Sequence, residues 1–244
     1  MIQHSHPFGE SIFHSLRDCL IVSCQASGES PLNHIDTLCR IAASVLRGGA
    51  GGLRAEGVEN IRAFREITKL PVIGLIKKYD ENGDVYITPD FQSARAISDA
   101  GADIIALDCT HRRLYRQEPW PELIRRIHNE LGKPVCADIA NIDDAIAAED
   151  AGADAVATTL YGYTAETAGM RRVSWPLVEA LVERMTIPVI VEGHITQPDE
   201  VRKAFKIGVN SVVVGSAITS PESITARFVL ATEDYSPDSS DKRQ

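Results

Sequence analysis

Two stretches of the chain, AGADIIALD at residues 100–108 and AGADAVATT at residues 151–159, repeat the same pattern 51 residues apart. Each contains a glycine that can end a helix, because glycine tolerates the positive φ of a helix C-cap. Each then continues into an apolar run, which is typical of a strand buried on both faces of a parallel sheet. IGVNSVVVG at 207–215 and RGGAGGLRA at 47–55 show weaker forms of the same transition.

One further helix–strand–helix passage lies between the two stretches, so each repeat holds two strand–helix units. Eight strands are predicted in this way, each followed by a helix: CLIVSCQ at 19–25, GGLRAE at 51–56, PVIGLIK at 71–77, DIIALD at 103–108, PVCADI at 134–139, DAVATT at 154–159, PVIVEG at 188–193 and SVVVGS at 211–216. Alternating strands and helices imply right-handed crossovers and a parallel sheet. Eight units in 244 residues favour the α/β class and a closed (β/α)8 TIM barrel over an open doubly wound sheet.

The barrel is expected to occupy residues 1–244 as a single domain, since no linker interrupts the pattern. Residues 8–18 predict an extra N-terminal helix that closes the barrel floor. The polar tail at 236–244, SPDSSDKRQ, is expected to be disordered.

Composition limits the classes of partner. The chain carries 25 basic and 34 acidic residues, and a net charge of −9 argues against nucleic acid and membrane surfaces. A local pocket can still be positive and bind a phosphorylated small molecule. Five cysteines without a C-x-x-C pair indicate reduced thiols in a cytoplasmic protein, and we expect no metal site. No signal peptide and no apolar run of membrane-spanning length is expected.

The active sites of (β/α)8 barrels lie at the C-terminal ends of the strands. At these ends the sequence places polar side chains or glycine turns that we expect to converge on one rim. They are Gln25, Arg54, Lys77, Asp108, Asp138, Thr158 with Thr159, Glu192, and Gly215 with Ser216.

Lys77 ends the apolar run PVIGLI, so we expect it to be partly desolvated, with a lowered pKa that suits a base. A Schiff base, or simple binding of an anion, are the alternatives. Lys78 is expected to point away. Glu192 could act as an acid or bind a substrate hydroxyl, and a plain ion pair with Lys77 or Arg54 is its alternative role.

The last two predicted strands end in VEGHI and VGSAI, which contain Gly193, Gly215 and Ser216. The loops after strands 7 and 8 of such barrels often bind phosphate through backbone N–H groups. Glycine lets the backbone approach a ligand closely. We therefore predict a phosphate site there, with Tyr163 as a further ligand contact.

The chain resembles the N-acetylmannosamine-6-phosphate 2-epimerases from about Leu20 to Phe228. The resemblance lies in the phrases LIVSCQ, GLRAEGVENI, PVIGLIKK, VYITP, GADIIALDCT, ADIA, TTLYGYT, VEG and VVVGSAIT. It implies a (β/α)8 barrel that interconverts N-acetylmannosamine 6-phosphate and N-acetylglucosamine 6-phosphate in sialic acid catabolism. It also implies that Lys77 is the base at C2, that Glu192 is its carboxylate partner, and that Gln25, Arg54 and Asp138 contact the sugar. The resemblance further implies that the reaction requires no cofactor.

Two positions depart from the family pattern. Ser220 stands where the family has an arginine that helps to hold the substrate. After strand 4, the chain keeps Arg112 but has Leu114 at a second arginine position. His111, Arg113, Arg116 or His194 could supply the missing charge, or the substrate could lack the phosphate.

Three readings therefore stay open beside the phosphorylated epimerase. One is an epimerase of an unphosphorylated or different 2-acetamido sugar. Another is a different phosphate-binding barrel enzyme, such as an aldolase or a cyclising synthase, and the third is a non-catalytic sugar-phosphate-binding barrel. An exposed helix face could also pair two copies into a homodimer, although nothing in the sequence marks which helix.

Overall fold

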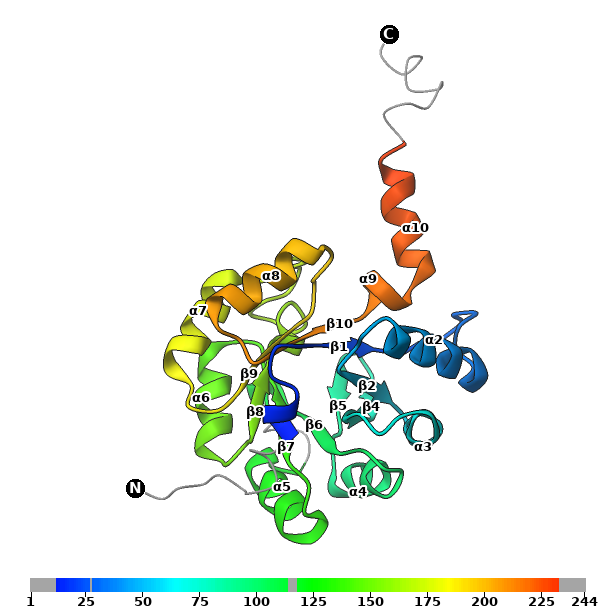
Figure 1. The fold of residues 1–244 in the computed structure, drawn as a ribbon. Coiled ribbons are helices and arrows are strands. Elements are labelled where there is room, and N and C mark those ends of the chain that lie inside the picture. Colours follow the sequence, from blue (N-terminus) through cyan, green and yellow to red (C-terminus); the bar gives the residue numbers. More distant parts are fainter. Residues whose placement is uncertain (1–11, 27, 114–117, 233–244) are drawn as a thin grey trace.

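Eight parallel strands close into a barrel in the computed structural model, which describes residues 12–26, 28–113 and 118–232 (Figure 1). Around the barrel the order is β1-β10-β9-β8-β7-β6-β3-β2, and β1 closes it by pairing with both β10 and β2. The barrel strands are β1 (Cys19–Ser23), β2 (Gly52–Glu56), β3 (Val72–Leu75), β6 (Ile104–Asp108), β7 (Val135–Asp138), β8 (Ala155–Ala157), β9 (Val189–Glu192) and β10 (Ser211–Val214). The prediction of a (β/α)8 barrel with these eight strands is confirmed.

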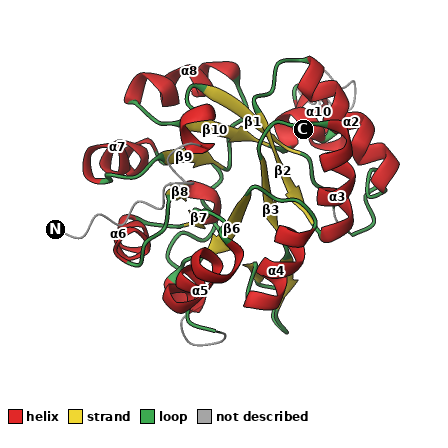
Figure 2. Cartoon of the chain, turned by 60° about the horizontal axis from the view of Figure 1, so that its bottom comes forward, coloured by secondary structure: helices red, strands yellow, loops and turns green. Residues whose placement is uncertain are grey.

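Helices surround the strands on the outside of the barrel (Figure 2). They are α2 (Ile35–Arg47), α3 (Val58–Ile67), α4 (Phe91–Asp99), α5 (Trp120–Arg126), α6 (Ile142–Asp150), α7 (Trp175–Arg184) and α8 (Pro198–Ile207). The short α9 (Ser216–Thr219) follows β10, and α10 (Pro221–Leu230) projects away from the barrel (Figure 1). Short helical turns cover His111–Arg113, Ile127–Leu131 and Thr158–Leu160.

The repeated Gly-Ala-Asp segments join helices to strands in the same way. Gly101 and Gly152 directly follow the C-cap residues of α4 and α6 and adopt positive φ values of 103° and 96°, which glycine tolerates at this position. The aspartates that follow accept hydrogen bonds from backbone N–H groups of neighbouring strands. Asp103 accepts from Val72 at 2.9 Å, and Asp154 accepts from Val135 at 2.7 Å. Each aspartate therefore ties the start of its own strand to the start of the barrel strand that precedes it in the chain.

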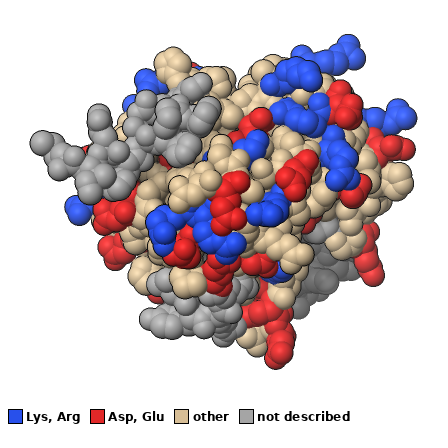
Figure 3. Space-filling model, turned by 90° about the horizontal axis from the view of Figure 1, so that it is seen from below, with Lys and Arg blue, Asp and Glu red and all other residues tan. Residues whose placement is uncertain are grey.

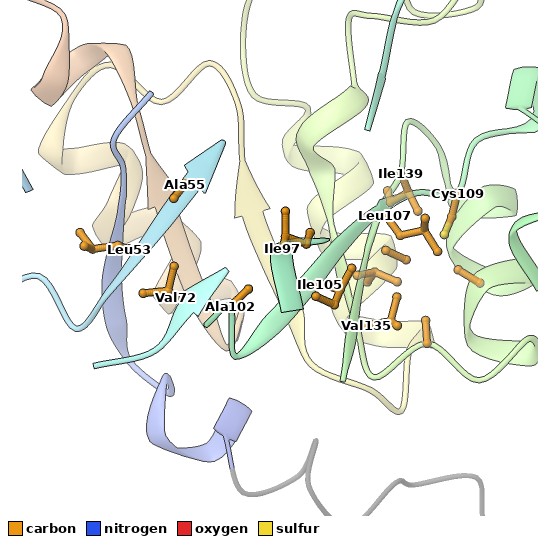
Figure 4. Close-up of a cluster of buried hydrophobic side chains, with 14 of the residues drawn as sticks. Leu53, Ala55, Val72, Ile97, Ala102, Ile105, Leu107, Cys109, Val135 and Ile139 are labelled. Carbon is orange, nitrogen blue, oxygen red and sulfur yellow. The ribbon is translucent and has the colours of Figure 1, made fainter. Parts of the chain in front are cut away.

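The hydrophobic core has two layers, one on each side of the barrel wall. The outer layer lies between strands and helices and includes Leu53, Val72, Ile97 and Ile105 (Figure 4). The inner layer fills the barrel with Ile21, Ile73, Leu75, Ile104, Ala106, Cys136, Ala155, Ile190 and Val213. Strand residues alternate between the two layers, because successive side chains point to opposite faces of a sheet. Burial on both faces explains why the strands read as continuous apolar runs.

The predicted N-terminal helix is present in part. Within 8–18 the structure describes residues 12–18, of which 12–15 are helical. Phe13 and Leu16 are buried and belong to the inner layer, so this segment closes one end of the barrel. Asn210 donates a hydrogen bond to the carbonyl oxygen of Phe13 at 3.1 Å, which attaches the segment to the start of β10. Residues 8–11 and the tail at 236–244 lie outside the described residues.

The structure corrects one predicted strand. PVIGLIK was expected to continue to Lys77, but β3 ends at Leu75 and Lys77 begins an antiparallel hairpin, β4 (Lys77–Tyr79) with β5 (Val85–Ile87). The carboxylate of Asp80 shapes the hairpin turn by accepting hydrogen bonds from the N–H groups of Asn82 and Asp84, both at 2.9 Å. The turn chemistry of the sequence YDENGDV therefore outweighs the continuity of the apolar run.

The molecular surface mixes charges of both signs. Basic and acidic side chains are interspersed over the face drawn in Figure 3. None of the helices within the described ranges is long and apolar enough to cross a membrane. The five cysteines, all of them described, are free thiols.

Candidate active site

A cavity of about 790 Å³ opens at the C-terminal ends of the barrel strands. Its walls bring together residues from the beginning, middle and end of the chain. Eight of the nine predicted site residues line it: Gln25, Arg54, Lys77, Tyr163, Glu192, Gly193, Gly215 and Ser216. The ninth, Asp138, is fully buried and is not among the lining residues.

Lys77 reaches the cavity from the start of the hairpin. Its preceding neighbour, Ile76, is fixed in place by Thr88. The N–H of Thr88 donates to the carbonyl oxygen of Ile76 at 2.7 Å, and the N–H of Ile76 donates to Thr88 Oγ1 at 3.3 Å. Thr88 holds a positive φ of 47°, an uncommon conformation for a β-branched residue. Such strain persists only where surrounding structure imposes it.

The side chain of Lys77 makes no hydrogen bond or ion pair with any described residue. Burial lowers the pKa of Lys77, against the opposing effect of the carboxylates of Glu56, Glu192 and Asp138. The expected lowering of the pKa is therefore seen, and a larger share of this amine is neutral than in water.

Arg54 and Asp138 form a buried ion pair beneath the cavity. Arg54 Nη2 lies 2.6 Å from Asp138 Oδ2 and Nη1 lies 3.1 Å from Oδ1, with the side chains 1% and 0% exposed. Thr159 donates a further hydrogen bond to Asp138 Oδ1 at 2.6 Å. Burial alone would lower the pKa of Arg54, but Asp138 and Glu192 outweigh it and raise the pKa above its ordinary value. Arg54 is therefore a permanent cation in the cavity wall.

Glu192 ends β9 and faces the same cation. Its Oε2 lies 2.9 Å from Arg54 Nη1, so the predicted ion pair forms with Arg54. The Thr158 hydroxyl fixes the backbone of Glu192 by donating to its carbonyl oxygen at 2.8 Å and accepting from its N–H at 3.0 Å. Burial raises the pKa of Glu192 to about 7, despite the opposing effect of Arg54. Both protonation states are therefore accessible near neutral pH.

The glycines predicted for phosphate binding lie on the same cavity wall as Ser216. Gly193 has a φ of 95°, which an L side chain rarely adopts, and Gly215 directly precedes α9. Gln25 lies nearby on the chain segment after β1 and donates to Ser23 Oγ at 2.9 Å.

Tyr163 stands at the cavity edge and is 49% exposed. Its ring stacks on the imidazole of His194, with centroids 5.9 Å apart and planes 10° from parallel. His194 holds a positive φ of 59° and its Nε2 lies 3.0 Å from the carbonyl oxygen of Tyr161. The stacking on His194 therefore holds the Tyr163 ring in a fixed position at the cavity edge.

Comparison with known proteins assigns the chain to a family. The model described as "Putative N-acetylmannosamine-6-phosphate epimerase" matches residues 38–234. A Clostridioides difficile (strain 630) protein named "Putative N-acetylmannosamine-6-phosphate 2-epimerase" is 46% identical over 214 residues, which cover 88% of this chain and 96% of that protein. This chain belongs to that epimerase family.

Other members and solved structures agree. A Thermosynechococcus vestitus relative of the same name is 45% identical, with 88% of this chain and 94% of the relative covered. The structure of the N-acetylmannosamine-6-phosphate 2-epimerase from Clostridium perfringens matches with a TM-score of 0.85 at 39% identity, covering 90% of this chain and 95% of that one. A thiamine phosphate pyrophosphorylase from Pyrococcus furiosus, at 18% identity and a TM-score of 0.59, shares the fold.

The structure describes one of the two departures from the family pattern, Ser220, and the retained Arg112. Ser220 lines the cavity, and its hydroxyl caps α10 by accepting from the N–H of Ser223 at 3.2 Å. Arg112 donates to the carbonyl oxygens of Tyr163 at 3.0 Å and Val85 at 2.8 Å, so it joins two loops. His111 pairs with Asp144, and of the four residues considered for compensation only His194 is described as lining the cavity. The side chain of Arg113, with Leu114 and Arg116, falls outside the described parts.

At the rim, Asp108 and Arg171 differ from the expected arrangement, whereas Lys78 agrees with it. Asp108 is buried and accepts hydrogen bonds from the N–H and hydroxyl of Thr110, so it organises its own loop. Lys78 points away, as predicted, and pairs with Asp90 at 2.7 Å. Arg171 lines the cavity but was not predicted, because it lies in an aperiodic segment after β8.

Proposed function

We propose that the chain interconverts N-acetylmannosamine 6-phosphate and N-acetylglucosamine 6-phosphate by removing and returning the proton at C2. One observation carries the proposal: in a chain of this family, an unpaired lysine of lowered pKa and a carboxyl group that titrates near neutrality share one cavity. A non-catalytic sugar-phosphate binder would have little use for that pair.

Lys77 is the proposed base. The C2 proton becomes acidic in the open-chain aldehyde, because the C1 carbonyl oxygen takes up the electrons of the broken C–H bond. The neutral amine of Lys77 accepts that proton, and an enolate forms. A proton delivered from water to C2 on the opposite face gives the epimer, and the Lys77 ammonium releases its proton to water, which restores the free amine.

Arg54 and Glu192 are proposed to stabilise the enolate oxygen. Arg54 is a fixed cation in the cavity wall, and protonated Glu192 can donate a hydrogen bond to developing negative charge. Asp138 supports this arrangement through Arg54 and Thr159, since its carboxylate bonds to both. We assign Asp138 to positioning Arg54, and Gln25 to contacting the sugar from the cavity wall.

The phosphate end of the substrate is proposed to lie at Gly193, Gly215 and Ser216. These residues line one part of the cavity, and glycine permits close approach of a ligand to the backbone. The residues described contain no cluster of three or more His, Cys, Asp or Glu side chains suited to a metal ion. The proposed route takes its base from Lys77 and its charge stabilisation from Arg54 and Glu192.

Cellular location and assembly are also proposals. Five free cysteines fit a reducing compartment, so we place the protein in the cytoplasm.

We propose a homodimer formed through α10, which projects away from the ring of helices (Figure 1). None of its ten residues, all described, is buried, and Phe228 is 72% exposed. Apolar burial against a second copy would stabilise the pair. Light scattering should then report a dimer that Phe228→Glu dissociates, and a wild-type monomer at working concentration would refute it.

Proton NMR in D2O tests the activity. N-acetylmannosamine 6-phosphate and its unphosphorylated counterpart are each incubated with wild-type protein and with Lys77→Ala. We expect the C2 proton signal of the phosphorylated sugar to disappear as the gluco epimer appears, in wild type alone. Exchange with the unphosphorylated sugar alone would indicate a changed substrate, and exchange with neither would refute the proposal.

A further inference from the structure

The cations of the cavity wall differ in how their charge is balanced. Arg54 is matched by Asp138 and Glu192. Lys77 faces nearby carboxylates and has a lowered pKa, so its charge is not permanent. Arg171 is exposed, lines the cavity and has no ion-pair partner among the described residues. Its permanent charge is therefore available to an anionic ligand.

Arg171 is held against the cavity by stacking. Its guanidinium carbon lies 5.8 Å from the centroid of the Tyr163 ring, within the range of a cation–π interaction. The same ring stacks on His194, the residue after Gly193. Arg171, Tyr163 and His194 thus form a continuous wall, which we call the stacked wall. It leads from solvent to the glycine proposed to receive phosphate.

The loop that carries Arg171 is folded to place it there. Gly162, with a φ of 92°, comes so close to two other segments that an added Cβ would lie 2.4 Å from the Met170 carbonyl oxygen and 2.9 Å from His194 Nε2. The Thr167 hydroxyl accepts a hydrogen bond from the Gly162 N–H at 2.8 Å, and the Met170 N–H donates to the Thr167 carbonyl oxygen at 3.1 Å. These contacts hold the backbone of Met170, the residue before Arg171, close to Gly162 and to the His194 side chain of the stacked wall.

The α10 side of the cavity offers no such cation among its described lining residues. There the lining consists of Ser216, Thr219, Ser220 and Glu222. Ser220 is a neutral helix cap, and Glu222 adds a negative charge that would repel an anion. A phosphorylated substrate in this cavity therefore needs positive charge from another wall.

We propose that Arg171 is the specificity-determining residue that makes this chain prefer the phosphorylated over the unphosphorylated 2-acetamido sugar. The inference rests on the proposed epimerase function and adds the group that reads the phosphate. The guanidinium group can donate two parallel hydrogen bonds to phosphate oxygens. Stacking on Tyr163 already restricts the Arg171 side chain, so less conformational entropy is lost when phosphate binds.

Arg171→Gln tests the proposal, with Arg172→Gln as matched control. Arg172 is an exposed neighbour of equal charge that is not among the lining residues. We expect Arg171→Gln to raise KM for N-acetylmannosamine 6-phosphate by about 10- to 100-fold with kcat little changed, as loss of a charge-assisted hydrogen bond predicts. KM for the unphosphorylated sugar should not change. Inhibition by inorganic phosphate should weaken in the same variant, and Arg171→Lys should fall between it and wild type.

The outcomes separate this inference from the proposed function. Equal behaviour of Arg171→Gln and Arg172→Gln, or an equal rise in KM for both sugars, would overturn the role of Arg171 while the epimerase stands. Absence of turnover in wild type would overturn the epimerase. Calorimetric binding of N-acetylmannosamine 6-phosphate then decides on Arg171. Selective weakening in Arg171→Gln upholds its role, whereas equal binding by both variants, or no binding by wild type, rejects it.

Discussion

Arg54 and Asp138 lie 84 residues apart in the chain, yet they form a two-point ion pair with almost no exposure to solvent. Arg54 extends from β2 and Asp138 from the end of β7, so the pair spans the barrel interior. A buried pair of this kind contributes little as a unit compared with apolar packing, but removing Asp138 leaves the buried Arg54 cation with Glu192 alone, whose pKa of about 7 makes it a partial counter-charge. Its importance is therefore tested by removing one partner.

Asp138→Asn should destabilise the protein strongly. Loss of one partner of a buried ion pair typically costs about 3 to 5 kcal/mol, which lowers Tm by roughly 6 to 20 °C in a protein of this size. Thermal unfolding measures the change. Glu59→Gln is the matched control, because Glu59 pairs with Arg62 on the surface, where the side chains are 69% and 57% exposed. That substitution should stay within about 0.5 kcal/mol of wild type. Similar Tm values for the two variants would contradict the structural role of the buried pair.

Lys77→Met should abolish most of the activity while the fold is kept. Removal of a general base typically lowers the rate by about 10²- to 10⁴-fold. Lys78→Met is the control, since Lys78 pairs with Asp90 outside the cavity lining and should retain near wild-type turnover. Loss of the C2 proton signal in D2O measures both. If the two variants lose activity equally, Lys77 is not the base.

The barrel could be predicted from sequence because its signals are local. A glycine followed by an apolar run recurs at four strands, with an aspartate between them at two, and burial on both faces gives the strands continuous apolar sequences. The hairpin after β3 was missed, because the apolar run PVIGLI continues into Lys77 and hides the break at Ile76. The turn residues Asp80 to Gly83 carried the signal that could have revealed it.

The site was predictable to the extent that barrel geometry gathers strand ends. That rule identified Lys77, Glu192 and Arg54 as neighbours of one cavity. Which of them pair is a matter of side-chain direction across the barrel, and nothing in the local sequence encodes it. The rule also missed Arg171, because the segment from Tyr161 to Ser174 follows neither helical nor strand periodicity.

Glu192→Gln should stabilise the protein at high pH and leave its stability unchanged at low pH. The pKa of Glu192 is about 7 in the fold against an ordinary value of 4.5, so the folded state holds the proton more tightly than the unfolded chain. The tighter binding of this proton stabilises the folded state fully below about pH 4.5, and the stabilisation is lost as the pH rises through 7. The loss amounts to about 3 kcal/mol.

Glutamine stays neutral throughout, so Glu192→Gln escapes that loss. We expect equal unfolding free energies for variant and wild type at pH 4.5, and a variant more stable by about 3 kcal/mol at pH 8. Urea titration at the two pH values measures both. A difference that is the same at pH 4.5 and pH 8 would mean that Glu192 does not titrate in this range.

Gly162→Ala should damage the stacked wall more than an equivalent change elsewhere in the same loop. The new Cβ would meet the Met170 carbonyl oxygen at 2.4 Å, and the φ of 92° is unfavourable for alanine. Gly169→Ala is the matched control, since Gly169 has a similar φ of 83° but no atom within 4 Å of an added Cβ. Both variants incur the backbone cost of about 1 to 3 kcal/mol, but the clash in Gly162→Ala must also move Met170 or His194. We therefore expect Gly162→Ala to lower Tm further and to raise KM for the phosphorylated sugar, with KM for the unphosphorylated sugar little affected. Steady-state kinetics on both sugars, beside thermal unfolding, decide the matter. Identical KM values in the two glycine variants would show that the contact between Gly162 and Met170 does not set the position of Arg171.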